Sequence, residues 1–189
     1  MRQNNGYASN WVLSAYHYMQ QCELDALKEI IDGLKPNSVC VNIGAGFGTS
    51  GMAFIESDTV GKLYTIDIYA TEKESTLGNL EYEMGVFRQF GFDKDIRYKQ
   101  ILGDSIPIGK NWKYEKIDML FIDGDHTYEH CWKDIQTWIP LIKPYGIMAF
   151  HDFEEPNWPG VGQAIKELLI PYSTVLKRAA TFIAIRLGI

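Results

Sequence analysis

Apolar residues along the chain follow two alternating spacings, one typical of helices and the other of buried strands. Apolar positions three and four residues apart predict helices, at residues 8–21, 25–34, 49–56, 127–142 and 161–170. Short apolar runs rich in β-branched residues predict strands, at residues 38–44, 62–69, 96–105, 116–124 and 147–152, with two more between 172 and 187. Residues 70–91 are polar, and their helical spacing is weak.

This alternation of strands and helices indicates the fold class. Near-continuous apolar strands separated by helices indicate a sheet buried on both faces. We therefore predict an α/β, Rossmann-like, doubly wound fold with a mainly parallel seven-stranded sheet that ends in an antiparallel hairpin strand. We expect residues 1–189 to form one domain, with N-terminal helices in 1–35 and the ligand-binding core in 36–189. Locally, "KPYG" at 143–146 predicts a turn, and Ser9 or Asn10 is expected to cap the first helix.

Charge and composition narrow the classes of partner. A net charge of −6 without a run of Lys or Arg argues against nucleic-acid binding. No stretch of about 18 uninterrupted apolar residues occurs, so we expect no membrane span. Cys22, Cys40 and Cys131 are far apart and show no metal-ligand spacing, which predicts free thiols in a reducing compartment. The first residues lack the apolar segment of a signal peptide, so the cytoplasm is the expected location.

The stretch "VNIGAGFGTS", residues 41–50, places three glycines at every second position after a predicted strand. Glycines at this place let the backbone approach a ligand, and the following helix offers unpaired N–H groups. Gly44, Gly46 and Gly48 form GxGxG, whereas the dinucleotide fingerprint would need a glycine where Thr49 stands. The match to a pyrophosphate-binding turn is therefore incomplete, and a tight turn without a ligand is the alternative.

Two acidic residues at later strand ends favour an adenosine-type ligand. Asp67 ends the second predicted strand, where a carboxylate can accept hydrogen bonds from both hydroxyls of a ribose. Asp104 and Ser105, in "LGDS" after the third strand, would lie near an adenine. For Asp104, a role as a turn or helix-cap residue remains the alternative.

Together with these features, "FIDGDHTYE" and "DIQTWIPLIKPYGIMAFHDF" resemble the class I S-adenosylmethionine-dependent methyltransferases. The sequence is most similar to their small-molecule O-methyltransferase branch (methyltransferase family 24), which includes macrocin and cephalosporin-pathway enzymes. The resemblance begins near Pro36 and implies S-adenosylmethionine as the cofactor. It departs at Asn42, where the family usually has an acidic residue. The implied cofactor-binding residues are Asn42, Gly44, Ala45, Gly46, Gly48, Asp67, Ile68, Asp104, Ser105 and Asp123.

Acidic residues and histidines follow the fourth and fifth predicted strands, which are neighbours in this topology. In related enzymes, the positions of Asp123, His151 and Asp152 tend to bind a metal, here Mg²⁺ or another divalent cation. The position of His126 tends to provide the general base, so the resemblance implies catalytic roles for His126 and Asp123. The family often has an acidic residue where His151 stands, which admits a softer ion.

Structural alternatives exist for four of the residues that follow these strands. Asp123 could cap a turn facing the cofactor, and His126 could orient a loop. His151 could be a structural histidine. Asp125 could cap the helix that begins near Thr127.

The predicted function is methyl transfer from S-adenosylmethionine to a hydroxyl of a small sugar-like or natural-product-like molecule. A nicotinamide-dependent oxidoreductase and a non-catalytic binding or assembly protein with the same fold are the alternatives. The expected partner is the small-molecule acceptor, without nucleic acid or membrane, and a homo-oligomer stays open. The acceptor pocket could involve Trp11, Tyr16, Tyr18, residues 71–84 and residues 153–158.

Overall fold

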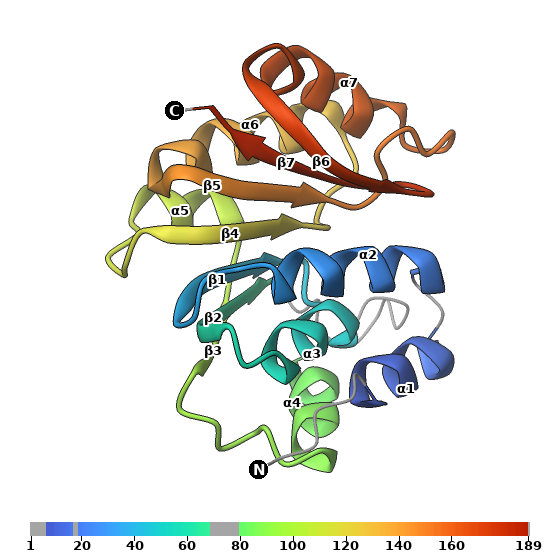
Figure 1. Cartoon of the computed structure of the whole chain (residues 1–189), viewed down its shortest axis with the longest axis vertical. Helices are drawn as coiled ribbons and strands as arrows, with labels where there is room; N and C mark the ends of the chain where they lie inside the picture. The colour runs from blue at the N-terminus through green and yellow to red at the C-terminus, as the bar shows by residue number, and fades with distance from the viewer. Residues whose placement is uncertain (1–6, 17–18, 69–79, 189) are drawn as a thin grey trace.

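A seven-stranded sheet forms the centre of the computed structural model, which describes residues 7–16, 19–68 and 80–188 (Figure 1). The strand order is β3-β2-β1-β4-β5-β7-β6. Strands β1 to β5 pair in parallel, and β7 runs antiparallel to both β5 and β6, which confirms the predicted fold class. The strands are β1 (Ser38–Ile43), β2 (Val60–Asp67), β3 (Tyr98–Leu102), β4 (Ile117–Ile122), β5 (Ile142–Phe150), β6 (Ser173–Ala179) and β7 (Phe182–Leu187).

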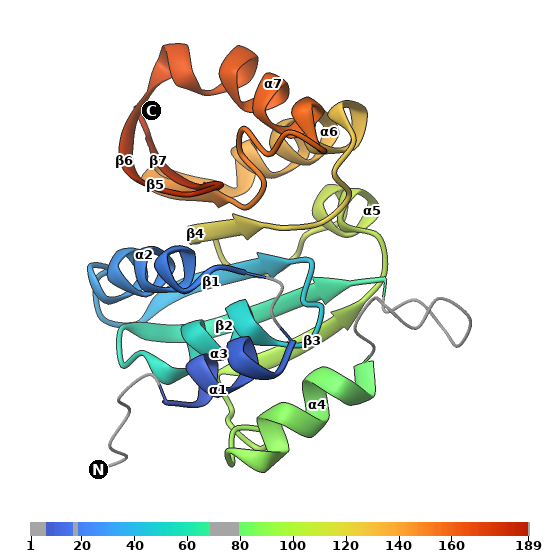
Figure 2. The ribbon, with the colours of Figure 1, turned by 90° about the vertical axis from the view of Figure 1, so that its right-hand side faces the viewer.

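Helices cover both faces of this sheet (Figure 2). One face carries α1 (Tyr7–Tyr16), α2 (Gln21–Asp32), α3 (Thr49–Glu56) and α4 (Leu80–Gln89). The other carries α5 (Ser105–Lys110), α6 (Tyr128–Trp138) and α7 (Pro159–Leu168). Short 3-10 helices, Ile139–Leu141 and Ile170–Tyr172, precede β5 and β6.

The sheet separates two hydrophobic cores. Successive residues of β1 alternate between them, so that Cys40 packs in the core under α1–α4 and Val41 in the core under α6 and α7. All six residues of β1 are buried. Burial on both faces explains why this strand is an almost unbroken apolar run in the sequence.

The strand order places a ligand-binding crevice between β1 and β4. From β1 the chain proceeds through β2 to β3 on one side, whereas β4 and β5 lie on the other side. In doubly wound sheets, ligands bind beyond the carboxyl ends of the strands at this reversal. The ends of β1 to β5 and the segments directly after them carry the residues that the sequence pointed to.

Several local predictions differ from the structure. Residues 143–146, predicted as a turn, lie within β5. There Tyr145 has a φ of +61°, and the pairing with β4 is irregular. The helix predicted to Ile142 ends at Trp138, because the chain tightens into a 3-10 helix that contains Pro140. Ser9 and Asn10 lie inside α1 rather than capping it.

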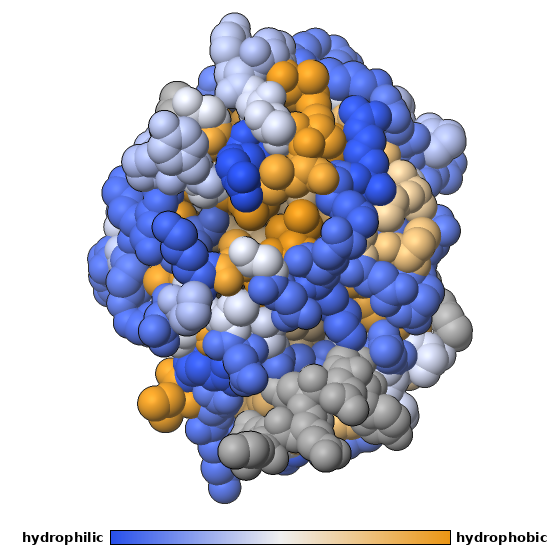
Figure 3. Space-filling view, in the orientation of Figure 1, coloured by the Kyte–Doolittle hydropathy of each residue, from blue (hydrophilic) through white to orange (hydrophobic). Residues whose placement is uncertain are grey.

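Two further predictions concern membrane-spanning helices and the cysteines. None of the helices in the described part of the chain is long and apolar enough to cross a membrane. All three cysteines are free, with Cys40 and Cys131 buried and Cys22 exposed. Hydrophilic side chains cover most of the face in Figure 3, and apolar residues reach its surface mainly near β6 and β7.

Candidate active site

A cavity of about 830 Å³ lies at the carboxyl ends of the central strands. Its volume is in the range of small-molecule sites. Most of the residues predicted from the sequence line this cavity: Gly44, Ala45, Gly46, Asp67, Ile68, Asp104, Ser105, Asp123, His126, His151 and Asp152. The cavity therefore joins the predicted cofactor residues to the acidic and histidine residues.

The two first glycines of the loop after β1 have different structural roles. Gly44 and Gly46 have φ values of +81° and +51°. A Cβ on Gly44 would lie 1.7 Å from the backbone oxygen of Asp123, whereas a Cβ on Gly46 would meet no atom within 4 Å. Gly44 thus allows the loops after β1 and β4 to pack together, and Gly46 leaves open space in the cavity wall.

Asp67, the last residue of β2, is held in the wall of the cavity. The N–H of Gly46 donates to its Oδ2 atom at 3.0 Å. This hydrogen bond fixes the carboxylate beside Ile68, whose side chain is largely exposed. A carboxylate fixed at the end of the second strand suits a ribose diol.

Asn42 and Gly48 are the two predicted cofactor residues that do not line the cavity. Asn42 is fully buried in β1, and its Oδ1 accepts a hydrogen bond from Ser50 Oγ at 3.2 Å. Gly48 is the N-cap of α3, with a φ of +92°. Both residues lie behind the wall, and Ser50 rather than Asn42 faces the cavity.

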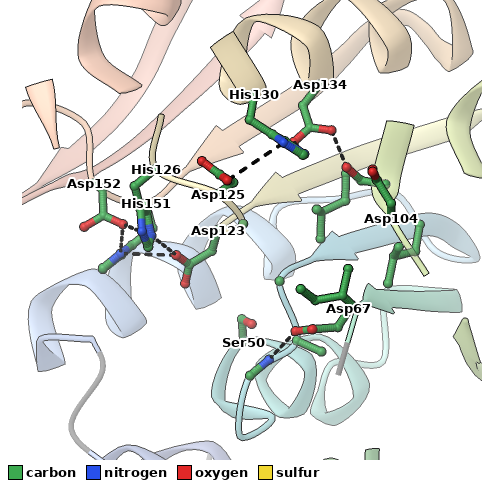
Figure 4. A pocket seen from close by; sticks show the side chains of 18 of the residues that line it. Ser50, Asp67, Asp104, Asp123, Asp125, His126, His130, Asp134, His151 and Asp152 are labelled. Atoms are coloured by element: carbon green, nitrogen blue, oxygen red, sulfur yellow. Dashed lines mark hydrogen bonds and ion pairs between the residues drawn. The ribbon is translucent and has the colours of Figure 1, made fainter. Parts of the chain in front are cut away.

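A polar cluster lies on the side of the cavity formed by α5 and α6 (Figure 4). Ser105 Oγ donates to Asp134 Oδ1 at 2.5 Å, and His130 Nε2 lies 3.8 Å from Asp134 Oδ2. Asp104 is the N-cap of α5, where its Oδ1 accepts from the N–H of Ile106 at 2.8 Å. Asp104 therefore both caps a helix and lines the cavity.

The N-cap of α6 is not Asp125, the residue suggested from the sequence. Thr127 is the N-cap, and its Oγ1 accepts from the N–H of His130 at 3.3 Å. Asp125 instead accepts the N–H of Thr127 at 2.8 Å and so stabilises the turn before the helix.

Asp134 is expected to make stability depend on pH. Its side chain is buried, and burial raises its pKa from 3.8 to about 6. Because the folded-state pKa is the higher one, stability present at low pH is lost as the pH rises through about 6. We expect Asp134→Asn to increase the free energy of unfolding by about 1–3 kcal/mol at pH 8 and by less at pH 4.

Urea unfolding at the two pH values measures this effect. Glu129→Gln, an exposed change on the same helix, is the control. An equal effect of Asp134→Asn at both pH values would show that its carboxyl group does not titrate in this way.

On the opposite side of the cavity, the ends of β4 and β5 bring an acidic and histidine cluster together (Figure 4). His126 Nε2 lies 3.0 Å from Asp152 Oδ2 and 3.7 Å from Asp123 Oδ1. One ligand atom from each of these three residues lies within 4.8 Å of the others. Asp152 has a φ of +59°, so its backbone adopts the left-handed region next to this cluster.

His151 connects the same carboxylates to a distant helix. Its Nδ1 lies 3.1 Å from Asp152 Oδ2 and 3.6 Å from Asp123 Oδ1. Its Nε2 lies 3.1 Å from Oε2 of Glu23, in the first turn of α2. His151 is thus a structural histidine on one side of its ring and a candidate ligand on the other.

The carboxylates strongly favour the charged form of both histidines. Hydrogen bonds to Asp123 and Asp152 raise the pKa of His126 to about 9. Burial would lower the pKa of His151, but the charge of Asp123 and hydrogen bonds to Asp152 and Glu23 raise it to about 11. The prediction that His126 is a base assumed an unperturbed pKa. In this structure His126 can act as a base only if the negative charge of Asp123 and Asp152 beside it is reduced.

Few of the aromatic residues suggested for the acceptor pocket line the cavity. Trp158 does, and its ring stacks on the ring of His126 at 4.9 Å between centroids. Trp11 instead packs against Phe90, because α1 presents it to α4. The side chains of Tyr16 and Tyr18 and residues 69–79 lie outside the described residues. Of the suggested segment 71–84, only residues 80–84 are described, and none of them is among the residues that line the cavity.

The sequence pattern missed several residues of this site, among them His130, Asp134, Met19 and Glu23. His130 and Asp134 were detectable in principle, because their spacing of four places them on one face of α6. Met19 and Glu23 precede the region of resemblance, and no local pattern links them to His151.

Comparison with protein families agrees with this site. A family model described as a methyltransferase domain matches residues 41–153, which is more than half of the chain. Two curated relatives are uncharacterized proteins: y4gI of Sinorhizobium fredii, 23% identical over 130 residues, and R132 of Acanthamoeba polyphaga mimivirus, 31% identical over 67 residues. The matched segments cover 66% and 35% of this chain but only 14% and 27% of those proteins.

Solved structures share the fold at low sequence identity. A putative caffeoyl-CoA O-methyltransferase from Staphylococcus aureus has a TM-score of 0.71 and 18% identity, with 97% of this chain and 91% of that chain covered. An O-methyltransferase from Bacillus cereus in complex with S-adenosylhomocysteine has a TM-score of 0.71 and 16% identity, with 95% and 90% covered. The chain therefore belongs to the methyltransferase domain family and has the fold of the class I S-adenosylmethionine-dependent O-methyltransferases.

Proposed function

We propose that the protein transfers the methyl group of S-adenosylmethionine to a hydroxyl of a small molecule, with assistance from a divalent cation. The observation that carries this proposal is one cavity that joins Gly46 and Asp67 to Asp123, His126 and Asp152. The first pair suits a nucleoside, and the second group suits deprotonation of an acceptor. Family membership and structures bound to S-adenosylhomocysteine support the cofactor.

The cavity wall fits an adenosine-containing cofactor. Gly46 leaves open space at the loop after β1, and Asp67 is fixed by a backbone N–H. Asp104 and Ser105 line the part of the cavity where an adenine would lie. S-adenosylmethionine supplies an electrophilic methyl group on its sulfonium when it is bound.

The acidic and histidine cluster fits a divalent cation. One possible ligand atom from each of Asp123, His126 and Asp152 lies within 4.8 Å of the others, so the three side chains could contact a single ion. Asp152 Oδ2 is 3.0 Å from His126 Nε2 and 3.1 Å from His151 Nδ1. Asp123, Asp152 and one histidine would hold the cation, which lowers the pKa of a hydroxyl that it binds.

His126 is the residue that we assign as the general base. It lies at the mouth of the site, where it stacks on Trp158, and it is more exposed than His151. A cation held by Asp123 and Asp152 would offset the negative charge that raises the pKa of His126. The pKa of His126 would then lie closer to the neutral range that suits a base.

Trp158 bounds the acceptor side of the cavity and favours a ligand with a flat or ring-shaped face. Some structural neighbours are named for a small molecule that they methylate or bind. They include a TDP-rhamnose 3'-O-methyltransferase of calicheamicin biosynthesis and the MycE methyltransferase bound to Mg, S-adenosylhomocysteine and mycinamycin VI. These names support a sugar-like or natural-product-like acceptor for this chain.

Calorimetry with S-adenosylhomocysteine tests the cofactor part of this proposal. We expect binding by the wild type and about 10- to 100-fold weaker binding by Asp67→Asn, because an amide replaces a charged hydrogen-bond acceptor. Asp58→Asn, an exposed change in the turn before β2, is the control and should bind as the wild type does. Absence of binding by the wild type would refute the proposal.

A panel of hydroxyl acceptors with Mg²⁺, Mn²⁺ or Zn²⁺ tests the catalytic part. Transfer of a labelled methyl group to an acceptor hydroxyl is the expected result. Cofactor binding without transfer to any acceptor in the panel would favour the alternative of a non-catalytic binding protein.

A further inference from the structure

We propose that Glu23 is a positioning residue which holds His151 with Nδ1 directed at Asp123 and Asp152, so that the site selects a transition-metal ion over Mg²⁺. This inference rests on the metal-assisted form of the proposed function. Glu23 lies on α2, which precedes the region that matches the family model. Its role comes from contacts between segments that are far apart in the sequence.

Glu23 is buried, and both of its carboxylate oxygens are engaged. Oε1 accepts hydrogen bonds from the N–H and Oγ1 of Thr181, at 2.8 and 2.6 Å. Oε2 accepts from the N–H of Gln20 at 2.7 Å and faces His151 Nε2 at 3.1 Å. The carboxylate is therefore fixed from three directions and cannot rotate away from the histidine.

This arrangement determines which nitrogen of His151 carries the proton. An ionised carboxylate only accepts hydrogen bonds, so Nε2 of His151 must be the donor. Nδ1 faces the carboxylates of Asp123 and Asp152, which hold a second proton on the ring, and a metal ion bound there would take the place of that proton and use the Nδ1 lone pair. Histidine ligands in metal sites commonly donate their other N–H to a carboxylate in this way.

The nitrogen donor changes the metal preference of the site. Mg²⁺ favours oxygen ligands in near-octahedral geometry, whereas imidazole suits ions such as Zn²⁺, Fe²⁺ and Co²⁺. The ring of His151 is only 10% exposed and is held on both sides. A histidine fixed in this manner favours the ions that accept nitrogen.

Binding of Co²⁺ and Mg²⁺ to the metal-free full chain tests the proposal. We expect Glu23→Gln to weaken Co²⁺ binding by about 10- to 100-fold and Mg²⁺ binding by less than about threefold. The glutamine amide would donate to His151 Nε2, which moves the proton to Nδ1 and removes the lone pair. The visible absorption of bound Co²⁺ should change as the nitrogen ligand is lost.

Two control variants separate positioning from structural support. Thr181→Val removes a hydroxyl donor to Glu23 without touching His151, and it should leave the ratio of Co²⁺ to Mg²⁺ affinity unchanged. Glu29→Gln makes the same chemical change at an exposed position of α2. An equal loss of affinity for Co²⁺ and Mg²⁺ in Glu23→Gln, or no loss of affinity for either ion, would overturn the proposal.

Nitrogen-15 NMR of the wild type loaded with Zn²⁺ gives a second test if Glu23→Gln does not fold. The expected spectrum has a protonated Nε2 and a metal-bound Nδ1 for His151. Coordination by His126 instead of His151, or binding through Nε2 of His151, would contradict the proposal.

The same samples distinguish this inference from the proposed function. Binding of S-adenosylhomocysteine and transfer to acceptors report on the function, whereas the ratio of metal affinities reports on Glu23. If the wild type binds the cofactor and transfers the methyl group but Glu23→Gln leaves the ratio of Co²⁺ to Mg²⁺ affinity unchanged, only the role of Glu23 is refuted. If Glu23→Gln changes this ratio as expected but the wild type does not bind the cofactor, only the proposed function is refuted.

Discussion

Asp123→Asn is expected to lower kcat/KM for methyl transfer by about 10³-fold, a value within the range for loss of acid–base catalysis. Asp123 Oδ1 lies 3.7 Å from His126 Nε2 and 3.6 Å from His151 Nδ1, so its charge acts on both histidines. An amide of the same shape removes this charge and the proposed metal ligand. Its backbone oxygen, which packs against Gly44, stays in place.

Steady-state turnover with an acceptor from the panel measures this effect, and calorimetry measures the affinity for S-adenosylhomocysteine in parallel. We expect the affinity to change by less than about fivefold, because the effect lies on the reacting group. Glu129→Gln is the control, since it removes an exposed carboxylate on the next helix. A loss of turnover of less than tenfold would argue against a catalytic role for Asp123.

Gly44→Ala is expected to destabilise the fold by about 4 kcal/mol or more, at the high end for single substitutions. The new Cβ would lie 1.7 Å from the backbone oxygen of Asp123 and 2.4 Å from its carbonyl carbon. Backbone atoms cannot move aside as a flexible side chain could, so β1 and β4 would have to separate. The positive φ of +81° adds strain for any residue with a side chain.

Urea unfolding of three alanine variants tests this explanation. Gly46→Ala meets no atom, so we expect only the cost of its left-handed backbone, about 1–2 kcal/mol. Gly85→Ala, in α4 with nothing within 4 Å, should increase stability by about 0.5–1 kcal/mol. A loss for Gly44→Ala no larger than that for Gly46→Ala would show that the loop adapts.

The sequence was sufficient to predict the fold class because its main signals are local. Strands buried on both faces give continuous apolar runs, and this is how β1 and β4 were identified. The turn predicted at 143–146 is instead an irregular part of β5, where pairing with β4 passes from Ile142 directly to Ile147 and Tyr145 has a positive φ. Helix α5 was missed because its six residues, Ser105–Lys110, are too few to show helical spacing.

Only the site residues that lie at the ends of strands could be predicted from the sequence. Asp67, Asp123 and Asp152 follow strands whose order fixes their neighbours, so topology was enough to bring them together. The charge of His126 could not be predicted, because it depends on distances to two carboxylates. Glu23 could not be predicted either, because its partner His151 is 128 positions away.

The long separations around Glu23 also bear on the order in which the protein folds. This carboxylate links Gln20 and His151 to Thr181, which is 158 positions away. Closing loops of this length requires that most of the intervening chain is already compact. We therefore expect His151 to reach its final orientation late in folding, after the sheet has formed, so that a refolding chain acquires its overall shape before its selectivity for metal ions.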